Sequence, residues 1–327
     1  MIMTRLLLLL TVLLPMTANA FDLQGHRGAR GLAPENTLPA FARALSLGVT
    51  TLEFDVGVTR DGVVVVMHDR RLNPDVARGP DGQWLTGPGP AIVDLTFEEL
   101  QRYDVGRLKP DSAYAKSFAD QVAVDGTRAP KLAEVFALAA KAGNTAVRFN
   151  IETKLSPLAP TETVDPETFA RALIAEIRAA GAAARTSIQS FDWRTLQVVQ
   201  RDAPEIATVY LSLARGGGDN IQVGKAGASP WLAGRDIDDH GGSVPRLIKV
   251  LGGRVWSPLA NDLDEAGLKE AKALGLTIVP WTVNDEATMR RLVQMGVDGL
   301  ISDYPDRLRK VLAELGIALP APTPVTP

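Results

Sequence analysis

Residues 22–69 read DLQGHRGARGLAPENTLPAFARALSLGVTTLEFDVGVTRDGVVVVMHD, and the rest of the chain is organised around this stretch. Its segment TLEFDV has the composition of a buried strand, and side chains two apart on a strand point to the same face. Glu53 and Asp55 are therefore expected to converge, with the apolar residues between and beside them pointing the other way. Two convergent carboxylates predict a site for a hard divalent cation such as Mg²⁺ or Ca²⁺.

The same stretch contains two of the three histidines of the chain, and one of them is followed by an arginine. His26 and His68 have the side-chain chemistry of a general acid and base near neutral pH. Asp69 is placed to fix the tautomer of His68. Arg27 offers a planar set of donors that suits a phosphate. We therefore predict a site for a phosphate-containing substrate, the alternative being structural histidines.

Residues 1–20 have the pattern of a secretory signal peptide, with one positive charge, a short apolar run and the small-residue sequence Ala18-Asn19-Ala20. The apolar run is shorter than the ~20 residues that a membrane span needs. We expect cleavage after Ala20 and a periplasmic or secreted protein without a stable membrane anchor.

Composition narrows the class of protein. The chain has 46% hydrophobic and 22% charged residues and a net charge of −3, which predicts a globular protein and argues against a nucleic-acid partner. The absence of cysteine excludes disulfides and thiol chemistry. We expect one domain over residues 21–317.

Hydrophobic periodicity and turn residues predict alternating strands and helices. The strands are expected at residues 24–27, 51–56, 63–67, 146–152, 187–190, 206–211, 255–256, 276–283 and 299–302. The helices are expected at residues 37–47, with Asn36 as N-cap, and at 96–103, 131–142, 166–180, 193–201, 265–274, 286–295 and 306–315.

Three segments fall outside this alternation. Residues 70–128 are rich in loops and are expected to form a small insertion after the second strand. Residues 214–254 form a long glycine-rich segment, expected to be a lid or a surface excursion, and His240 is expected in a solvated loop there. The proline-rich residues 318–327 are expected to be a disordered tail.

Eight strand-then-helix units predict an α/β fold, a (β/α)8 TIM barrel, with a doubly wound open sheet as the main alternative. The barrel is favoured because many polar residues fall at the C-terminal ends of strands, which share one mouth in a barrel. These residues are His26, Glu53, Asp55, Glu152, Lys154, Gln189, Trp281 and Asp303.

The segment NIETK repeats the spacing of the first acidic pair. Glu152 and Lys154 are expected to share a face, with Glu152 as a third oxygen ligand and Lys154 as a cation close to the substrate. An ordinary surface ion pair is the alternative. The position at the end of an apolar strand, in register with Glu53 and Asp55, favours the functional interpretation.

Eight motifs in this order resemble those of the glycerophosphodiester phosphodiesterase family: HRG, PENT, E-x-D, DGVVVVMHD, ETK, QSF, WTVN and DGLISDYP. The resemblance covers residues 24–312 and implies a barrel that hydrolyses glycerophosphodiesters to glycerol 3-phosphate and an alcohol with a divalent cation. It implies that His26 and His68 are the acid and base, that Glu53, Asp55 and Glu152 are metal ligands, and that Arg27 and Lys154 contact phosphate. Gln189, Trp281 and Asn284 are expected to line the mouth, and Gln189 and Trp281 are expected to contact substrate.

Several alternatives stay open. The same barrel suits a phospholipase of the C or D type that forms a cyclic phosphate or acts on intact lipid, or a binding protein or adhesin without activity. A two-lobed solute-binding protein is disfavoured by the evenly spaced units. The all-carboxylate ligand set and the expected export favour Ca²⁺ over Mg²⁺. The sequence leaves the alcohol, the roles of the two histidines and the oligomeric state open.

Overall fold

The computed structural model describes residues 21–327. The predicted leader of residues 1–20, with its cleavage after Ala20, lies outside the described residues. Eight parallel strands form the barrel: β1 (Asp22–Gly25), β2 (Thr51–Val58), β4 (Arg148–Thr153), β5 (Thr186–Ser190), β6 (Ala207–Ser212), β7 (Val255–Pro258), β8 (Thr277–Ile278) and β9 (Gly299–Ser302).

The sheet curls into a ring because β1 pairs with β2 on one side and with β9 on the other. Between β8 and β9 the backbone N–H of Asp298 donates to Ile278 O at 2.9 Å, and that of Ile301 donates to Pro280 O at 3.0 Å. These bonds bring the two ends of the sheet together. The barrel prediction is confirmed, and the open-sheet alternative is wrong.

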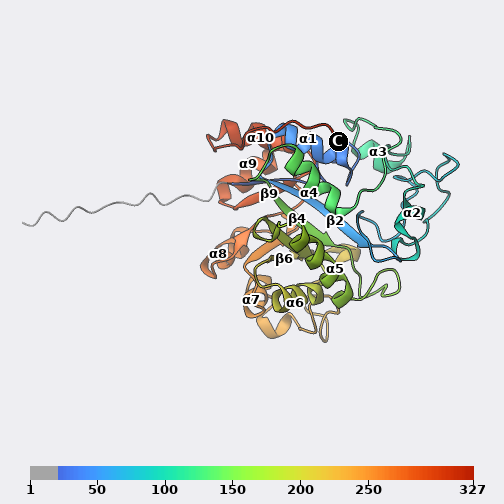
Figure 1. The fold of residues 1–327 in the computed structure, drawn as a ribbon. Coiled ribbons are helices and arrows are strands. Elements are labelled where there is room, and N and C mark those ends of the chain that lie inside the picture. Colours follow the sequence, from blue (N-terminus) through green and yellow to red (C-terminus); the bar gives the residue numbers. More distant parts are fainter. Residues whose placement is uncertain (1–20) are drawn as a thin grey trace, which may run out of the picture.

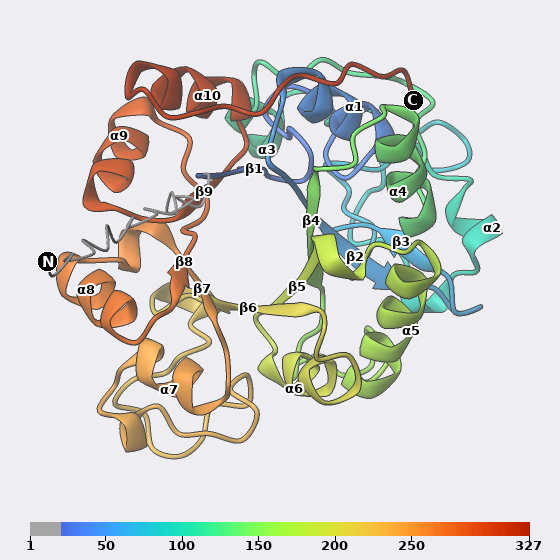
Figure 2. The same cartoon turned by 60° about the vertical axis from the view of Figure 1, so that its left-hand side comes forward.

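The outer helices follow the strands in turn and surround the ring, as Figure 1 and Figure 2 show. They are α1 (Leu38–Leu47), α4 (Leu132–Lys141), α5 (Pro166–Ala179), α6 (Trp193–Asp202), α7 (Val244–Val250), α8 (Glu265–Ala273), α9 (Glu286–Met295) and α10 (Pro305–Glu314). Their apolar faces and the outward faces of the strands form one continuous core. The helices therefore hold the strands by burying the face of the sheet that is turned away from the barrel axis.

Side-chain caps start several of these helices. Asp165, Asp192, Asp264 and Asp285 each accept a hydrogen bond from a backbone N–H in the first turn that follows them. At α1 the cap is Thr37, and the prediction of Asn36 is wrong. Asn36 adopts a left-handed backbone conformation (φ 57°), which aims its side chain at β2 and away from the helix.

The insertion follows a short strand, β3 (Val64–Val66), which pairs antiparallel with β2. It contains the 3₁₀ turn η1 (Ile92–Asp94) and the helices α2 (Phe97–Leu100) and α3 (Ala113–Ser117). A second apolar cluster, built around residues such as Leu72 and Leu100, supports it separately from the main core. The insertion lies beside the C-terminal end of β2 (Figure 1), so it borders the mouth of the barrel.

The segment 214–254 is anchored to the barrel by apolar side chains. Ile221, Leu232 and Ile237 are buried in the main core, and the backbone N–H of Trp193 donates to Trp231 O at 2.8 Å. The segment also contains α7, the outer helix of the β6 unit, which the sequence did not predict because it is only seven residues long. Its other elements are the 3₁₀ turns η3 (Gly216–Gly218) and η4 (Asp238–His240). Two more 3₁₀ turns lie outside this segment: η2 (Ala183–Arg185) before β5 and η5 (Ala260–Asp262) after β7.

Residues 318–327 form no helix or strand, but the prediction of a disordered tail is wrong. Leu319 and Val325 pack against the main core, and the N–H of Thr323 donates to Leu45 O at 2.9 Å. Figure 2 shows this segment running from α10 past α1 toward α4. Its apolar residues pack against the main core, and these contacts override the composition.

Within residues 21–327 no helix is both long enough and apolar enough to cross a membrane.

Candidate active site

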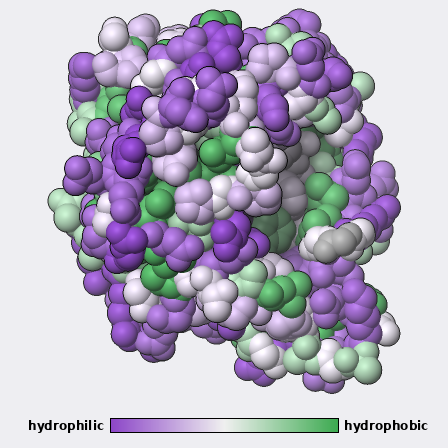
Figure 3. All heavy atoms as spheres, turned by 90° about the vertical axis from the view of Figure 1, so that its right-hand side faces the viewer, coloured by the Kyte–Doolittle hydropathy of each residue, from purple (hydrophilic) through white to green (hydrophobic). Residues whose placement is uncertain are grey.

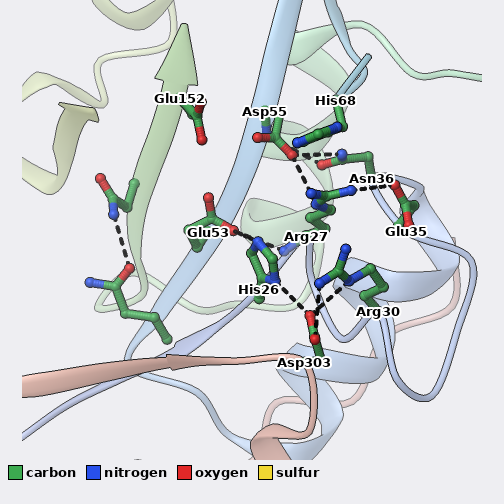
Figure 4. Close-up of polar contacts among 12 residues, drawn as sticks. His26, Arg27, Arg30, Glu35, Asn36, Glu53, Asp55, His68, Glu152 and Asp303 are labelled. Carbon is green, nitrogen blue, oxygen red and sulfur yellow. Dashed lines mark hydrogen bonds and ion pairs between the residues drawn. The ribbon is translucent and has the colours of Figure 1, made fainter. Parts of the chain in front are cut away.

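The three predicted acidic ligands meet at the C-terminal ends of two adjacent strands. Glu53 and Asp55 on β2 pair in register with Asn150 and Glu152 on β4. One carboxylate oxygen from each of Glu53, Asp55 and Glu152 lies within 4.8 Å of the others, and all three residues are buried. Figure 4 shows the three carboxylates facing the same space. The structure thus brings the predicted triad together.

Hydrogen bonds fix the first two carboxylates. Glu53 accepts the backbone N–H of Arg27 at 2.9 Å and the side-chain amide of Gln189 at 2.6 Å. Asn36 donates to Asp55 Oδ2 at 2.9 Å. Burial and the neighbouring Asp55 raise the pKa of Glu53. Burial also opposes ionisation of Asp55, but the cationic groups around it hold its pKa well below the usual range.

The chemistry of this cluster fits a divalent cation. Asp55 Oδ1 is buried and has no hydrogen-bond partner among residues 21–327. A buried carboxylate oxygen without a donor is costly unless a cation compensates it. With Glu53 and Glu152 beside it, the set offers hard oxygen donors of the kind that Ca²⁺ and Mg²⁺ take.

Glu152 and Lys154 share a face at the end of β4, as the spacing predicts. Lys154 Nζ donates to Glu152 Oε1 at 2.6 Å and lies 3.6 Å from Asp55 Oδ1. It also lies 3.1 Å from His68 Nε2. Burial and the negative charge of Asp55, opposed by Lys154, raise the pKa of Glu152 to about 7. Lys154 therefore connects the acidic cluster to one of the histidines.

His26 is held from the other side of the barrel. Its Nδ1 lies 2.5 Å from Asp303 Oδ1, just after β9, and its Nε2 lies 3.9 Å from Glu53 Oε2. Arg30 forms a two-pronged ion pair with the same aspartate, at 2.8 and 2.9 Å. Burial lowers the pKa of His26 to about 4, although Asp303 opposes the shift. The ring is therefore neutral near pH 7, with Nδ1–H held by Asp303 and Nε2 turned toward the carboxylates.

His68 has a parallel arrangement. Its Nδ1 lies 2.7 Å from Asp69 Oδ1, and Asn73 in turn donates to Asp69 Oδ2 at 2.8 Å. Burial, together with the nearby charges of Arg27 and Lys154, lowers the pKa of this imidazole. The expectation that Asp69 orients His68 is met by this geometry, and His68 Nε2 faces Lys154.

Arg27 is aimed into the site by an unusual backbone. Its φ is 49°, in the left-handed region, and the flanking Gly25 is required because a Cβ there would lie 2.1 Å from Gly28 O. The guanidinium lies 3.4 Å from Asp55 and 2.7 Å from Glu35. Tyr114 of α3 donates to Glu35 and accepts from Arg27 at 3.3 Å, so the insertion also holds this cation.

These groups surround one cavity of about 150 Å³ at the C-terminal ends of the strands. The lining also includes apolar residues, among them Phe191 and Trp281, whose rings meet edge to face at 5.3 Å. The surrounding face of the molecule, seen in Figure 3, is mostly hydrophilic with smaller hydrophobic patches. The cavity is lined by His26, Arg27, Arg30, Glu53, His68, Glu152, Lys154, Gln189, Phe191, Leu211, Trp281, Thr282 and Ile301.

Two predicted mouth residues have structural partners that the sequence does not reveal. Gln189 lines the cavity but uses its amide to hold Glu53. Asn284 is not among the lining residues and instead donates to Asp303 at 2.7 Å. The remaining predicted mouth residue, Trp281, lines the cavity and donates its ring N–H to Ser257 O at 2.9 Å. Contact of any of these with substrate stays a prediction.

Sequence reasoning missed four further residues of the site: Arg30, Glu35 and Asn36, which lie in the GARGLAPENT stretch, and Tyr114 of the insertion. Arg30 and Asn36 bind Asp303 and Asp55 directly. For Glu35 and Asn36 the signal was their place in the PENT motif, and for Arg30 it was the position between HRG and PENT. For Tyr114 the sequence holds no comparable signal.

Comparisons with known proteins agree with the geometry. Residues 26–307 match the profile described as the glycerophosphoryl diester phosphodiesterase family. The chain is 28% identical to a glycerophosphodiester phosphodiesterase of Caldanaerobacter subterraneus subsp. tengcongensis, over 89% of this chain and 97% of that protein. Among solved structures it resembles a Silicibacter pomeroyi protein named for the same enzyme, at 35% identity and TM-score 0.81, covering 92% of this chain and 95% of that one.

A more distant likeness shows the fold alone. A phosphodiesterase of Oleispira antarctica, solved in complex with the product sn-glycerol-3-phosphate, is 22% identical with TM-score 0.64, over 89% of this chain and 96% of that one.

Proposed function

Because the chain belongs to the glycerophosphoryl diester phosphodiesterase family, we propose that it hydrolyses glycerophosphodiesters to sn-glycerol 3-phosphate and an alcohol. The observation that carries the proposal is the shared cavity, where two histidines and three cationic side chains lie beside three convergent carboxylates. The name of the Caldanaerobacter relative supports the substrate class. The product held by the Oleispira relative supports the expected product.

Glu53, Asp55 and Glu152 would hold the divalent cation. When bound, such an ion supplies Lewis acidity toward the phosphate and a fixed template for the substrate. The all-carboxylate donor set supports Ca²⁺ over Mg²⁺, since Ca²⁺ accepts several carboxylate oxygens in flexible geometry. Calcium and magnesium affinities of residues 21–327, measured by calorimetry, test this choice.

The two histidines divide the proton transfers. One imidazole enters the step neutral, and its Nε2 takes the proton of the attacking oxygen, which is a water or the 2-hydroxyl of the substrate. The other enters as an imidazolium and gives its Nε2 proton to the leaving alcohol. Asp303 and Asp69 hold the Nδ1–H of His26 and His68, so each Nε2 is directed into the cavity. Arg27 and Lys154 offset the charge that builds on the phosphoryl oxygens.

The size and polarity of the pocket support soluble diesters over intact lipid. About 150 Å³ lined mainly by charged and polar groups suits a small headgroup better than two acyl chains. Cleavage of dioleoylphosphatidylcholine vesicles, assayed beside glycerophosphocholine, separates a phospholipase from the proposed enzyme. Turnover of the vesicles alone would favour the phospholipase.

The main test is release of glycerol 3-phosphate from a panel of glycerophosphodiesters, before and after EDTA treatment and with Ca²⁺ or Mg²⁺ restored. His26→Ala and His68→Ala are expected to lower kcat about 10²- to 10⁴-fold. Glu53→Gln is expected to raise the metal concentration needed for half-maximal rate. His240→Ala is the matched control, because His240 lies in η4 and outside the cavity lining.

Two results would contradict the proposal. One is turnover that is unchanged after EDTA treatment, which would show that the reaction does not need a metal ion. The other is a folded, metal-bound protein that releases no glycerol 3-phosphate from any diester, which would leave a binding protein on the same fold.

A further inference from the structure

A chain of hydrogen bonds runs through the interior of the barrel from the N-terminal end of β1 to the acidic cluster. Gln24 donates to Asp22 Oδ2 at 2.8 Å, and Asn150 donates to Gln24 Oε1 at 3.0 Å. Asn150 also donates to Gln189 Oε1 at 2.9 Å, and Gln189 donates to Glu53 at 2.6 Å. The three amides between the two carboxylates are at most 4% exposed.

The chemistry of the two ends determines the direction of every bond in this chain. Ionised carboxylates, the form in which Glu53 would hold a cation, only accept hydrogen bonds, so Gln24 and Gln189 turn their NH₂ groups outward, toward Asp22 and Glu53. Their carbonyl oxygens then face each other across the barrel. Asn150 lies between these oxygens and supplies a hydrogen to each.

A fourth contact fixes Asn150 itself. The hydroxyl of Ser187 donates to Asn150 Oδ1 at 2.9 Å, so the NH₂ group of Asn150 points at the two carbonyls. Partners beyond the immediate ligands orient metal-binding side chains and tune their affinity. Here the arrangement keeps the donor end of Gln189 on Glu53.

We propose that Asn150 is a positioning residue for the divalent cation, acting only through the orientation of Gln189. The inference rests on the metal site of the proposed function and extends it one layer into the barrel. Without Asn150, the carbonyl of Gln189 loses its donor and the amide can rotate. The rotated amide would present its oxygen to Glu53, which repels the carboxylate and disturbs the ligand.

The test measures metal affinity directly and does not depend on turnover. Ca²⁺ is titrated calorimetrically into metal-free wild type, Asn150→Ala, Gln189→Ala and the double variant, and Mg²⁺ is titrated in parallel. Each single variant is expected to bind about 10- to 100-fold more weakly. The double variant is expected to bind no more weakly than Gln189→Ala, because both substitutions remove the same interaction.

Two controls separate positioning from loss of stability. Val199→Ala truncates a fully buried apolar side chain in α6, away from the three amides on β1, β4 and β5. The metal affinity of this variant is therefore expected to equal that of wild type. Asn150→Ser retains more of the buried volume and is expected to fold if Asn150→Ala does not. Its shorter hydroxyl does not span both carbonyls, so it is expected to weaken binding as well.

The outcomes distinguish the two proposals. If wild type binds the ion and both Asn150 variants bind it as tightly as wild type does, the inference is overturned and the proposed function stands. If the two single effects multiply in the double variant, Asn150 acts by another route and the inference is again overturned. If wild type binds neither ion, the metal site fails and the inference fails with it.

Discussion

Each histidine of the cavity is held at Nδ1 by an aspartate, but the two aspartates come from different distances along the chain. Asp69 is the next residue after His68, whereas Asp303 lies 277 residues from His26. Asp303 also receives both prongs of Arg30 and the amide of Asn284. Asp303 thus holds three other side chains of the site in place, and its substitution tests all three contacts at once.

Asp303→Asn is expected to lower kcat about 10²- to 10⁴-fold while the fold is kept. The amide is uncharged, so it cannot stabilise an imidazolium at His26. Its NH₂ group can also donate to Nδ1, which favours the tautomer with the proton on Nε2. Steady-state kinetics with glycerophosphocholine and circular dichroism check the two parts of this expectation. Asp298→Asn, a substitution just before β9, is the matched control and should leave kcat unchanged. A kcat for Asp303→Asn within twofold of wild type would show that Asp303 does not contribute to catalysis through His26.

At this scale the sequence predicts residues that share a short motif and misses those whose partner is remote. Glu53 with Asp55, and Glu152 with Lys154, follow from strand spacing alone. The hydrogen bonds that Asn36 donates to Asp55 and that His26 donates to Asp303 do not, because a loop conformation creates the first and the closure of the barrel creates the second. Nor does the hydrogen bond that Gln189 donates to Glu53, since it depends on how neighbouring strands align.

At the scale of single elements, β6 and α6 are joined by a buried aromatic pair. Tyr210 on β6 meets Trp193 of α6 edge to face at 4.9 Å, and its hydroxyl accepts from Gln197 at 3.1 Å. Burial raises the pKa of Tyr210 to about 12. A tyrosine in an unfolded chain ionises near pH 10. Between about pH 10 and 12 the unfolded state therefore loses this proton while the folded state keeps it.

The free energy of unfolding therefore falls as the pH rises through this window. Tyr210→Phe should remove the part of this decrease that comes from ionisation of Tyr210 in the unfolded chain. Between pH 9 and pH 11 the difference between wild type and variant is expected to be about 1 kcal/mol. Urea unfolding at the two pH values measures it, with each protein compared with itself. Equal losses in both proteins would mean that Tyr210 ionises in the folded state as readily as in the unfolded chain.

Long elements with a clear apolar period are predictable from this sequence, and short ones are not. The prediction for α9, residues 286–295, matches the structure to the residue, and that for α5 differs only at its last position. The strand expected at residues 276–283 is reduced to β8, two residues long. The seven residues of α7 are too few to show a period. They are helical because Ser243 caps them and the core receives Leu247 and Ile248.

At the scale of the whole molecule, residues 318–327 join elements from the two ends of the chain. Arg309 of α10 donates to Pro320 O at 2.8 Å, and Asn144, after α4, donates to Thr323 Oγ1 at 3.0 Å. Together with the contact of Thr323 with Leu45, these bonds link the last helix to α1 and α4. The segment runs past the C-terminal ends of α1 and α4, on the side of the barrel away from the cavity (Figure 2).

Deleting residues 318–327 is expected to lower the free energy of unfolding by about 1–3 kcal/mol, because it exposes partly buried apolar surface around Leu319 and Val325. The effect on kcat should be absent, since the cavity lies at the other end. Thermal unfolding and kinetics of the truncated protein test both statements. Deletion of Pro327 alone is the control and should change neither quantity. A melting temperature equal to that of wild type would show that the contacts add no stability.

The pairing of β1 with β9 also affects how the chain folds during its synthesis. During synthesis the first barrel strand emerges with one of its edges unmatched, and it stays so until β9, the last barrel strand in chain order, has been made. An exposed strand edge invites pairing with other chains. Contacts so far apart in sequence also form slowly. A nascent chain that stops short of β9 therefore holds the three proposed metal ligands and both histidines of the cavity, yet it lacks Asp303, the aspartate that contacts Nδ1 of His26.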